Sequence, residues 1–313
     1  MKVLVTGSTG MIGTEFARQS RERGYETLGL ARSTAESRRA GVPDPSLIFA
    51  DILDPDAITE AVKKTKPDLI AHFAAQAFNG ISWQMETLTH ETNYLGTLNV
   101  LKACKAAAPK AKILLACSSA EYGIVPKEEQ PLKEHRLLRP LTPYGVSKVG
   151  TEALGYQYFI NYNLQIFLPR LFIHVGTGHP PATMIQNFAR QIALIKKGKM
   201  APAVHVGNIE TARDFIDVRD GVRGMYLLLD KGRAGEPINI CTGTAYSGRQ
   251  VLEMLLSIAG VKVNIVSDKS LLRPSDERLL LGDNTLLKSL GWKQEFSFEE
   301  TLRAVYADWL SRV

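Results

Sequence analysis

The chain has 313 residues, enough for one large α/β unit or two closely associated ones with a sizeable core. Its hydrophobic content is 45%, but it contains no apolar run long enough to span a bilayer and no targeting signature, so we expect a cytoplasmic protein without a membrane partner. The net charge is +6, yet Lys and Arg are scattered without a basic block, which favours a small polyanionic ligand over nucleic acid.

The first residues predict a strand that runs directly into a glycine-rich turn and then a helix. The turn has the spacing G-x-x-G-x-x-G. This arrangement binds dinucleotides, because glycines let the backbone approach a pyrophosphate and the helix N-terminus faces the anion. The residues predicted to contact a dinucleotide are Gly7, Gly10, Met11, Ile12 and Gly13.

A second strand is predicted over residues 26–31, and the residue that follows it bears on the cofactor. A carboxylate there would bind the ribose 2′-hydroxyl of NAD, whereas Arg32 offers a cation for the 2′-phosphate of NADP. The alternative is that Arg32 is a solvated loop residue. The sequence therefore favours NADP(H) over NAD(H).

Later apolar runs alternate with amphipathic stretches, which is typical of a doubly wound parallel sheet, the Rossmann fold. His72 lies inside one of these runs; a histidine in an apolar strand is more often packed and hydrogen-bonded, so it is given no catalytic role. The three cysteines are too few and too scattered for a disulfide framework or a metal site, and we expect buried thiols and no metal. The further predicted strands cover residues 47–50, 68–73, 112–117 and 164–170.

Tyr144 and Lys148 stand four residues apart in the run PYGVSK. If this run opens a helix, the two side chains project from one face. An ammonium beside a phenol lowers the phenol's pKa from about 10, which suits acid–base chemistry at neutral pH. Such pairs also occur on ordinary solvated helices, so this one gains its weight from the glycine turn that precedes it.

Together, the glycine turn and the Y-G-x-S-K motif resemble those of the extended short-chain dehydrogenase/reductase family, which includes nucleotide-sugar epimerases, dehydratases and reductases. The resemblance covers nearly the whole chain. It implies a homodimer through the helices that follow Asn93 and Tyr144, and a small interleaved α/β substrate-binding cap. The implied division is a Rossmann domain over residues 1–168, with a returning segment at about 209–236, and a cap over 169–208 and 237–313.

The resemblance also assigns residues to the cofactor. It places an Asp against the adenine, lets small residues lie close to the second half of the cofactor, and gives Lys148 the nicotinamide ribose. The matching residues here, beyond the glycine turn and Arg32, are Asp51, Ile52, Ala74, Ala75, Gln76, Asn93 and Tyr144.

The segment after residue 117 bears on the reaction. By resemblance, the catalytic hydroxyl beside Tyr144 is Ser118, with Ser119 as the near alternative. Sugar 4,6-dehydratases usually carry a carboxylate two residues before the tyrosine of the Tyr-Gly pair, where this chain has Ala120. Glu121 lies one residue later, and a one-residue step in an extended segment turns the side chain to the opposite face. The dehydratase interpretation is weakened, although a loop could reorient Glu121 as an acid or base.

Two C-terminal runs, GNIETARDFIDVRD and RPSD, look most like GDP-sugar members of the family, closest to GDP-4-keto-6-deoxy-mannose reductase and GDP-mannose 4,6-dehydratase. Guanidinium groups pair with phosphate oxygens in a bidentate way, which suits a diphosphate. Ile173 stands where relatives usually have an Asn, so one substrate contact differs. The residues expected at a nucleotide-diphosphate sugar are Ser82, Asn187, Arg213, Arg273 and Asp276.

The expected function is NADPH-dependent reduction of a 4-keto-6-deoxy nucleotide sugar, in which Tyr144 donates the proton, Lys148 lowers its pKa and Ser118 polarises the carbonyl. GDP-mannose 4,6-dehydration and nucleotide-sugar 4-epimerisation stay open as alternatives. A non-catalytic NADP-sensing protein is the alternative outside enzymes.

Overall fold

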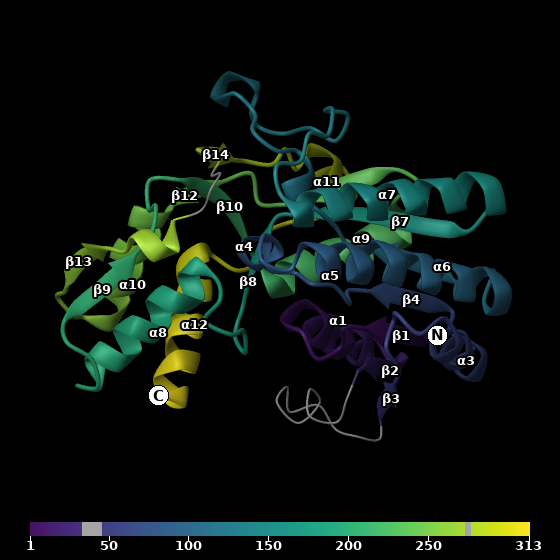
Figure 1. Ribbon diagram of the computed structural model, residues 1–313, viewed down its shortest axis with the longest axis horizontal. Helices are drawn as coiled ribbons and strands as arrows, with labels where there is room; N and C mark the ends of the chain where they lie inside the picture. The colour runs from purple at the N-terminus through teal and green to yellow at the C-terminus, as the bar shows by residue number, and fades with distance from the viewer. Residues whose placement is uncertain (33–45, 273–276) are drawn as a thin grey trace.

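The computed structural model describes residues 1–32, 46–272 and 277–313, and its larger sheet has eight strands in these residues (Figure 1). Their order is β11-β7-β5-β4-β1-β2-β3, with β6 beside β7, and every pairing is parallel. The strands are β1 (Lys2–Thr6), β2 (Glu26–Ala31), β3 (Leu47–Phe49), β4 (Leu69–His72), β5 (Lys112–Leu115), β6 (Cys117–Ser118), β7 (Gln165–Leu171) and β11 (Pro237–Ile240).

Helices cover both faces of this sheet because its strands are apolar on both sides. Leu4 of β1 packs with one helical layer, and its neighbours Val3 and Val5 pack with the other. The first layer is α3 (Pro55–Thr65), α6 (Gly96–Ala107) and α7 (Pro143–Tyr162); the second is α1 (Met11–Glu22), α9 (Val218–Lys231) and α11 (Thr285–Ser289). The predicted doubly wound parallel sheet is confirmed.

Short helical segments lie in several of the connections between strands and longer helices. Three of them lead from β4 to α6, and one follows Ser118 directly. They are α4 (Asn79–Ser82), α5 (Glu86–His90), the π-helical turn η2 (Glu91–Leu95) and the 3-10 turns η3 (Ser119–Glu121), η4 (Lys127–Glu129) and η5 (Lys269–Leu271).

A second core lies beside the large sheet, at the left of Figure 1. Its centre includes Phe298, whose ring stacks on Phe215 with centroids 5.3 Å apart. Three helices build it, α8 (Met184–Lys196), α10 (Gly248–Ala259) and α12 (Phe298–Arg312). The small strands are β8 (Ile173–Val175), β9 (Ala203–Val206), β10 (Ala212–Asp217), β12 (Ala245–Ser247), β13 (Asn264–Ser267) and β14 (Leu279–Leu280).

Two strands lie in a different sheet from the one expected from the sequence. β11 falls in the segment assigned to the cap, but it pairs with β7 and completes the large sheet. β10 falls in the returning segment, but it pairs with β8, β12 and β14 in a four-stranded sheet. Strand pairing is a long-range property, so a boundary drawn along the chain could not place these short strands. The division into two domains otherwise stays a prediction.

No helix of the described residues combines the length and the apolar character needed to cross a membrane.

Candidate active site

The turn between β1 and α1 is so tight that glycine is required at two of its positions. Gly7 has a φ of +67°, and a Cβ there would lie 2.6 Å from the backbone nitrogen of Ala74. A Cβ on Gly13 would lie 2.2 Å from the carbonyl oxygen of Gly7. α1 begins at Met11 without a side-chain cap or an acidic residue in its first turn. This cradle of backbone N–H groups fits the pyrophosphate of a dinucleotide.

The expected adenine end lies after β2 and β3. Arg32 follows β2 and is exposed. Asp51 is also exposed, and its Oδ1 accepts a hydrogen bond from the backbone N–H of Leu53 at 2.9 Å. Ile52 is buried in the core, where its side chain fills the space above Gly96. If Ile52 contacts a cofactor, it must therefore do so through its backbone atoms.

The loop after β4 contains Ala74, Ala75 and Gln76 and is held in place by Asn93. The Asn93 side chain accepts from the Gln76 backbone N–H at 2.8 Å, and its Nδ2 lies 3.1 Å from the Gln76 carbonyl. The same Nδ2 is 2.9 Å from Ser147 Oγ on α7. Asn93 thus fixes this loop against the helix that carries Tyr144. Its role at the cofactor stays a prediction.

His72, at the end of β4, is bonded on both ring nitrogens. Nδ1 lies 2.7 Å from Thr6 Oγ1, and Nε2 lies 3.1 Å from Thr97 Oγ1. Burial lowers the pKa of His72 to about 3, and the nearby Lys148 charge adds to this. A packed and hydrogen-bonded histidine, as the sequence predicted, is confirmed.

Ser118 and Tyr144 come together at the end of β6 and the start of α7. α7 begins at Pro143 because Thr142 caps it, accepting from the Gly145 N–H at 3.0 Å. Burial raises the pKa of Tyr144 to about 12, while a side-chain hydrogen bond with Ser118 opposes the rise. The neighbouring Ser119 is buried in η3. Ser118 therefore matches the expected partner of the phenol better than Ser119.

Lys148 lies on the same face of α7 as Tyr144, one turn later. Its Nζ is 5.8 Å from the centre of the Tyr144 ring and donates to the Ala116 carbonyl at 2.7 Å. Burial lowers the pKa of Lys148. The predicted direction for Tyr144 is corrected here: its pKa is raised, since desolvation of the phenolate outweighs the favourable interactions around it.

Glu121 is fully buried and points into the protein beneath Ser118. Its Oε1 accepts the Ser118 backbone N–H at 2.6 Å, which closes a capping box on η3. Its Oε2 lies 3.6 Å from Arg170 Nε. Burial and the adjacent Glu152 charge raise the pKa of Glu121 well above its usual value. This inward position does not match an acid or base that must reach a sugar.

The expected substrate residues have mixed surroundings. Ser82 is fully buried, and its hydroxyl donates to the Asn79 carbonyl at 2.7 Å. Asn187 is half-buried on α8. Arg213 forms an ion pair with Glu277, its Nη2 lying 3.2 Å from Oε2. Arg273 and Asp276 lie outside the described residues.

The other charged residues of the GNIETARDFIDVRD run have partners within the protein. Arg219 forms an ion pair with Asp217, Nη2 to Oδ2 at 2.7 Å. Asp214 is buried and accepts from Thr242, whose N–H and hydroxyl lie 2.9 and 2.7 Å from Oδ1. These residues serve the packing of the small sheet.

Sequence reasoning missed a buried ion pair below the site. Arg170 forms a two-pronged contact with Glu152, Nε to Oε2 at 2.8 Å and Nη2 to Oε1 at 2.6 Å. Its Nη1 also donates to the Tyr122 hydroxyl at 2.9 Å. The available signal was an arginine at the end of an otherwise apolar strand, which cannot be buried without a carboxylate partner.

Comparisons with known proteins agree with this geometry. A family model described as GDP-mannose 4,6 dehydratase matches residues 4–305. The chain is 33% identical to the GDP-6-deoxy-D-mannose reductase of Pseudomonas aeruginosa over 313 residues, covering 100% of this chain and 98% of that protein. It is 27% identical to the GDP-mannose 4,6 dehydratase of Homo sapiens, covering 97% and 90%.

Solved structures give the same result. The structure of RMD from Pseudomonas aeruginosa complexed with NADPH is similar with a TM-score of 0.87 and 32% identity, covering 100% of this chain and 99% of that one. The UDP-glucose 4-epimerase of Thermus thermophilus complexed with NAD has a TM-score of 0.89 and 27% identity, with 100% of both chains covered. The chain therefore belongs to the GDP-mannose 4,6 dehydratase family, within the extended short-chain dehydrogenases/reductases.

Proposed function

We propose that this protein reduces the 4-keto group of a GDP-linked 6-deoxy sugar, with NADPH as the reductant. The observation that carries the proposal is the 33% identity over the full chain to a GDP-6-deoxy-D-mannose reductase. The likeness to the structure of RMD complexed with NADPH supports the choice of cofactor, as does Arg32 after β2.

The proposed mechanism uses three side chains of this chain. Ser118 donates a hydrogen bond to the keto oxygen, and Tyr144 donates the proton that this oxygen needs when the carbonyl becomes an alcohol. Lys148 binds the ribose next to the nicotinamide. The bound cofactor supplies the hydride. The glycine cradle and Arg32 hold the pyrophosphate and the 2′-phosphate.

The Tyr144 phenol fits the acid that a reduction needs. Burial raises its pKa to about 12, so the phenol holds its proton at neutral pH and can donate it to the keto oxygen. A dehydratase also needs a further acid and base, and the carboxylate nearest to Ser118 in sequence, Glu121, is turned inward.

The decisive experiment compares two reactions. With the 4-keto-6-deoxy derivative of GDP-mannose, we expect NADPH absorbance to fall and a GDP-6-deoxyhexose to form. With GDP-mannose alone, we expect no keto sugar. A keto sugar in the second mixture would make the protein a dehydratase, and interconversion of two sugars without net NADPH use would make it an epimerase.

The variant Tyr144→Phe separates an enzyme from an NADP sensor. It keeps the ring and loses the proton donor, so turnover should fall by about 10²- to 10⁴-fold. NADPH binding, followed by fluorescence titration, should persist. A protein that only senses NADP would show no keto-sugar turnover in either form.

We also propose a homodimer through α7 and the segment that precedes α6. Large apolar side chains are exposed there: Tyr156 is 54% exposed, Ile160 58% and Leu95 45%. Such residues on neighbouring helices are typical of a buried interface. With the diphosphate-linked sugar as substrate, no nucleic acid or membrane partner is needed.

A further inference from the structure

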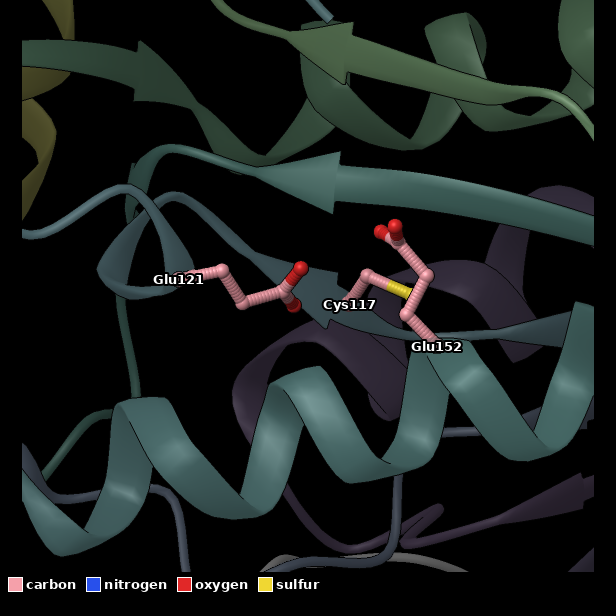
Figure 2. A group of neighbouring side chains, drawn as sticks. All are labelled: Cys117, Glu121 and Glu152. Atoms are coloured by element: carbon pink, nitrogen blue, oxygen red, sulfur yellow. The ribbon is translucent and has the colours of Figure 1, made fainter. Parts of the chain in front are cut away.

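A largely buried group of ionisable side chains adjoins Ser118. It consists of Cys117, Glu121 and Glu152, and one ligand atom from each lies within 4.8 Å of the others (Figure 2). Glu121 reaches the group from η3, Cys117 from β6 and Glu152 from α7. The proposed mechanism gives none of the three a role.

The two glutamates of this group are not equally well paired with a positive charge. Arg170 faces both glutamates, but its Nε and Nη2 are bonded to the two oxygens of Glu152, at 2.8 and 2.6 Å. Its Nη1 is bonded to the Tyr122 hydroxyl and to the Glu134 carbonyl, at 2.9 and 2.8 Å. Arg170 is therefore committed to Glu152, and Glu121 is left with the longer 3.6 Å contact.

The two oxygens of Glu121 differ in the same way. Oε1 accepts the Ser118 N–H at 2.6 Å, whereas Oε2 is shielded from solvent and has no hydrogen-bond donor among the described residues. A buried charged oxygen without a donor is costly. The cost disappears if Oε2 carries a proton, because it then becomes a donor toward Glu152. Burial and the Glu152 charge raise the pKa of Glu121 in agreement with this.

A metal ion is a poorer explanation of the group. Both oxygens of Glu152 are already occupied by Arg170, and a cation would have to sit beside that guanidinium. The thiol of Cys117 would also have to ionise, and burial raises its pKa well above the usual value. A proton on Glu121 neutralises the excess negative charge of the two glutamates without displacing Arg170.

The neutral acid is coupled to the reaction through Ser118. Glu121 holds the Ser118 backbone N–H, and the Ser118 hydroxyl accepts from the Ala120 N–H at 3.1 Å, so the two ends of η3 fix each other. We propose that Glu121 is a positioning residue: as a neutral carboxylic acid that shares its proton with Glu152, it holds Ser118 at the angle from which its hydroxyl meets the keto oxygen. This inference rests on the proposed reduction.

The neutral state of Glu121 matters as well as its hydrogen bond to Ser118. The charged and titratable groups around Glu121 come from three elements. Tyr144, Lys148 and Glu152 lie on α7, Arg170 lies on β7 and Cys117 lies on β6. A negative charge at Glu121 would oppose the charge that develops on Tyr144 as it gives up its proton. A neutral Glu121 keeps the hydrogen bond to Ser118 without that repulsion.

The test uses Glu121→Gln and Glu121→Ala in the full-length protein. Gln accepts from Ser118 and donates to Glu152, as a neutral glutamic acid does, so its kcat should stay close to that of the wild type. Ala removes the support, and kcat should fall by about 10- to 100-fold while KM for NADPH stays unchanged. The control is Glu134→Ala, which removes a glutamate that accepts from the Asn239 N–H at 2.9 Å instead of from Ser118; it should lower Tm and leave kcat.

A loss of kcat in Glu121→Gln equal to that in Glu121→Ala would overturn the proposal, because it would mean that the carboxylate charge is needed. Infrared spectroscopy of the free protein at neutral pH gives an answer that does not depend on activity or on the folding of a variant. We expect a carbonyl band of a protonated carboxylic acid, absent from Glu121→Gln; a wild type without that band also contradicts the inference. If the band is present but keto sugar is not reduced, the proposed function fails and the protonation of Glu121 stands.

Discussion

Burial, more than pairing, sets the protonation of the ionisable side chains around the site. It raises the pKa of the acids Tyr144 and Glu121 and lowers the pKa of the bases Lys148 and His72. The common cause is that a charge loses its hydration inside the protein, so each group is pushed toward its neutral form. Tyr144 consequently keeps its proton at neutral pH and His72 stays uncharged, and the proposed neutral state of Glu121 follows the same trend.

His72 makes a prediction about acid stability. Its pKa is lowered from 6.5 in the unfolded chain to about 3 in the folded protein, so between these values the unfolded chain binds the proton and the folded one does not. Its contribution is therefore present above pH 6.5 and lost as the pH falls toward 3. From pH 7 to pH 5 the free energy of unfolding should drop by about 2 kcal/mol on its account.

Urea unfolding at the two pH values measures this drop. The variant His72→Gln keeps a polar side chain between Thr6 and Thr97 but does not titrate, so its stability should depend less on pH than that of the wild type. The matched control is His205→Gln on β9, whose imidazole is exposed. An equal pH dependence in wild type and His72→Gln would rule out His72 as the cause.

The turn from β1 to α1 shows how a single connection can form a candidate binding site. Gly13 belongs to the first turn of α1 and presses against the carbonyl of Gly7, which is why the helix can start so close to the strand. At Gly7, this turn also packs against the backbone of Ala74 after β4. Replacement of either glycine must shift the backbone, because the added Cβ would meet backbone atoms and no flexible side chain that could move away.

We expect Gly13→Ala to weaken NADPH binding by at least about tenfold and to destabilise the protein by about 2 kcal/mol. The added Cβ would lie 2.2 Å from the Gly7 oxygen and force the cradle open. Gly24→Ala is the control: Gly24 has a φ of +75° but nothing within 4 Å of a Cβ, so it should cost about 1 kcal/mol and leave NADPH binding unchanged. Fluorescence titration and thermal unfolding give the two quantities; equal NADPH affinities in the two variants would refute the cradle.

The assembly of the whole molecule depends on which apolar surfaces are covered. α7 contributes its inner face to the core of the large sheet, through Leu154 and Tyr158, and leaves Tyr156 and Ile160 exposed on its outer face. The same helix carries Tyr144 and Lys148. A dimer through this face would therefore hold the catalytic helix from both sides.

The variant Ile160→Lys should convert the proposed dimer into a monomer, because it places a charge in the centre of an apolar interface. Leu137→Lys is the control; Leu137 is 66% exposed in the loop between η4 and α7 and belongs to neither segment of the proposed interface, so the mass should stay unchanged. Sedimentation at assay concentration measures both. A wild-type protein that sediments as a monomer contradicts the proposed interface.

Much of the candidate site could be predicted from the sequence, because it depends on residues that are close together in the chain. The glycine turn and the Tyr144–Lys148 spacing depend on residues within a few positions of one another, so they could be predicted without coordinates. The alternation of apolar strands with helices also predicted the parallel sheet. His72 could be predicted as structural because its apolar neighbours in sequence are its neighbours in the strand.

Contacts between distant segments had to come from the tertiary structure. Arg170, Glu152 and Glu121 belong to β7, α7 and η3, and only folding brings two carboxylates and one guanidinium into one buried space. The raised pKa of Tyr144 and the sheet that receives β11 are long-range properties of the same kind. The sequence by itself determined the glycine turn and the Tyr144–Lys148 spacing, which are local and form the proposed cofactor cradle and catalytic pair. Burial and charge balance depend on the whole fold, and these decide which groups hold a proton.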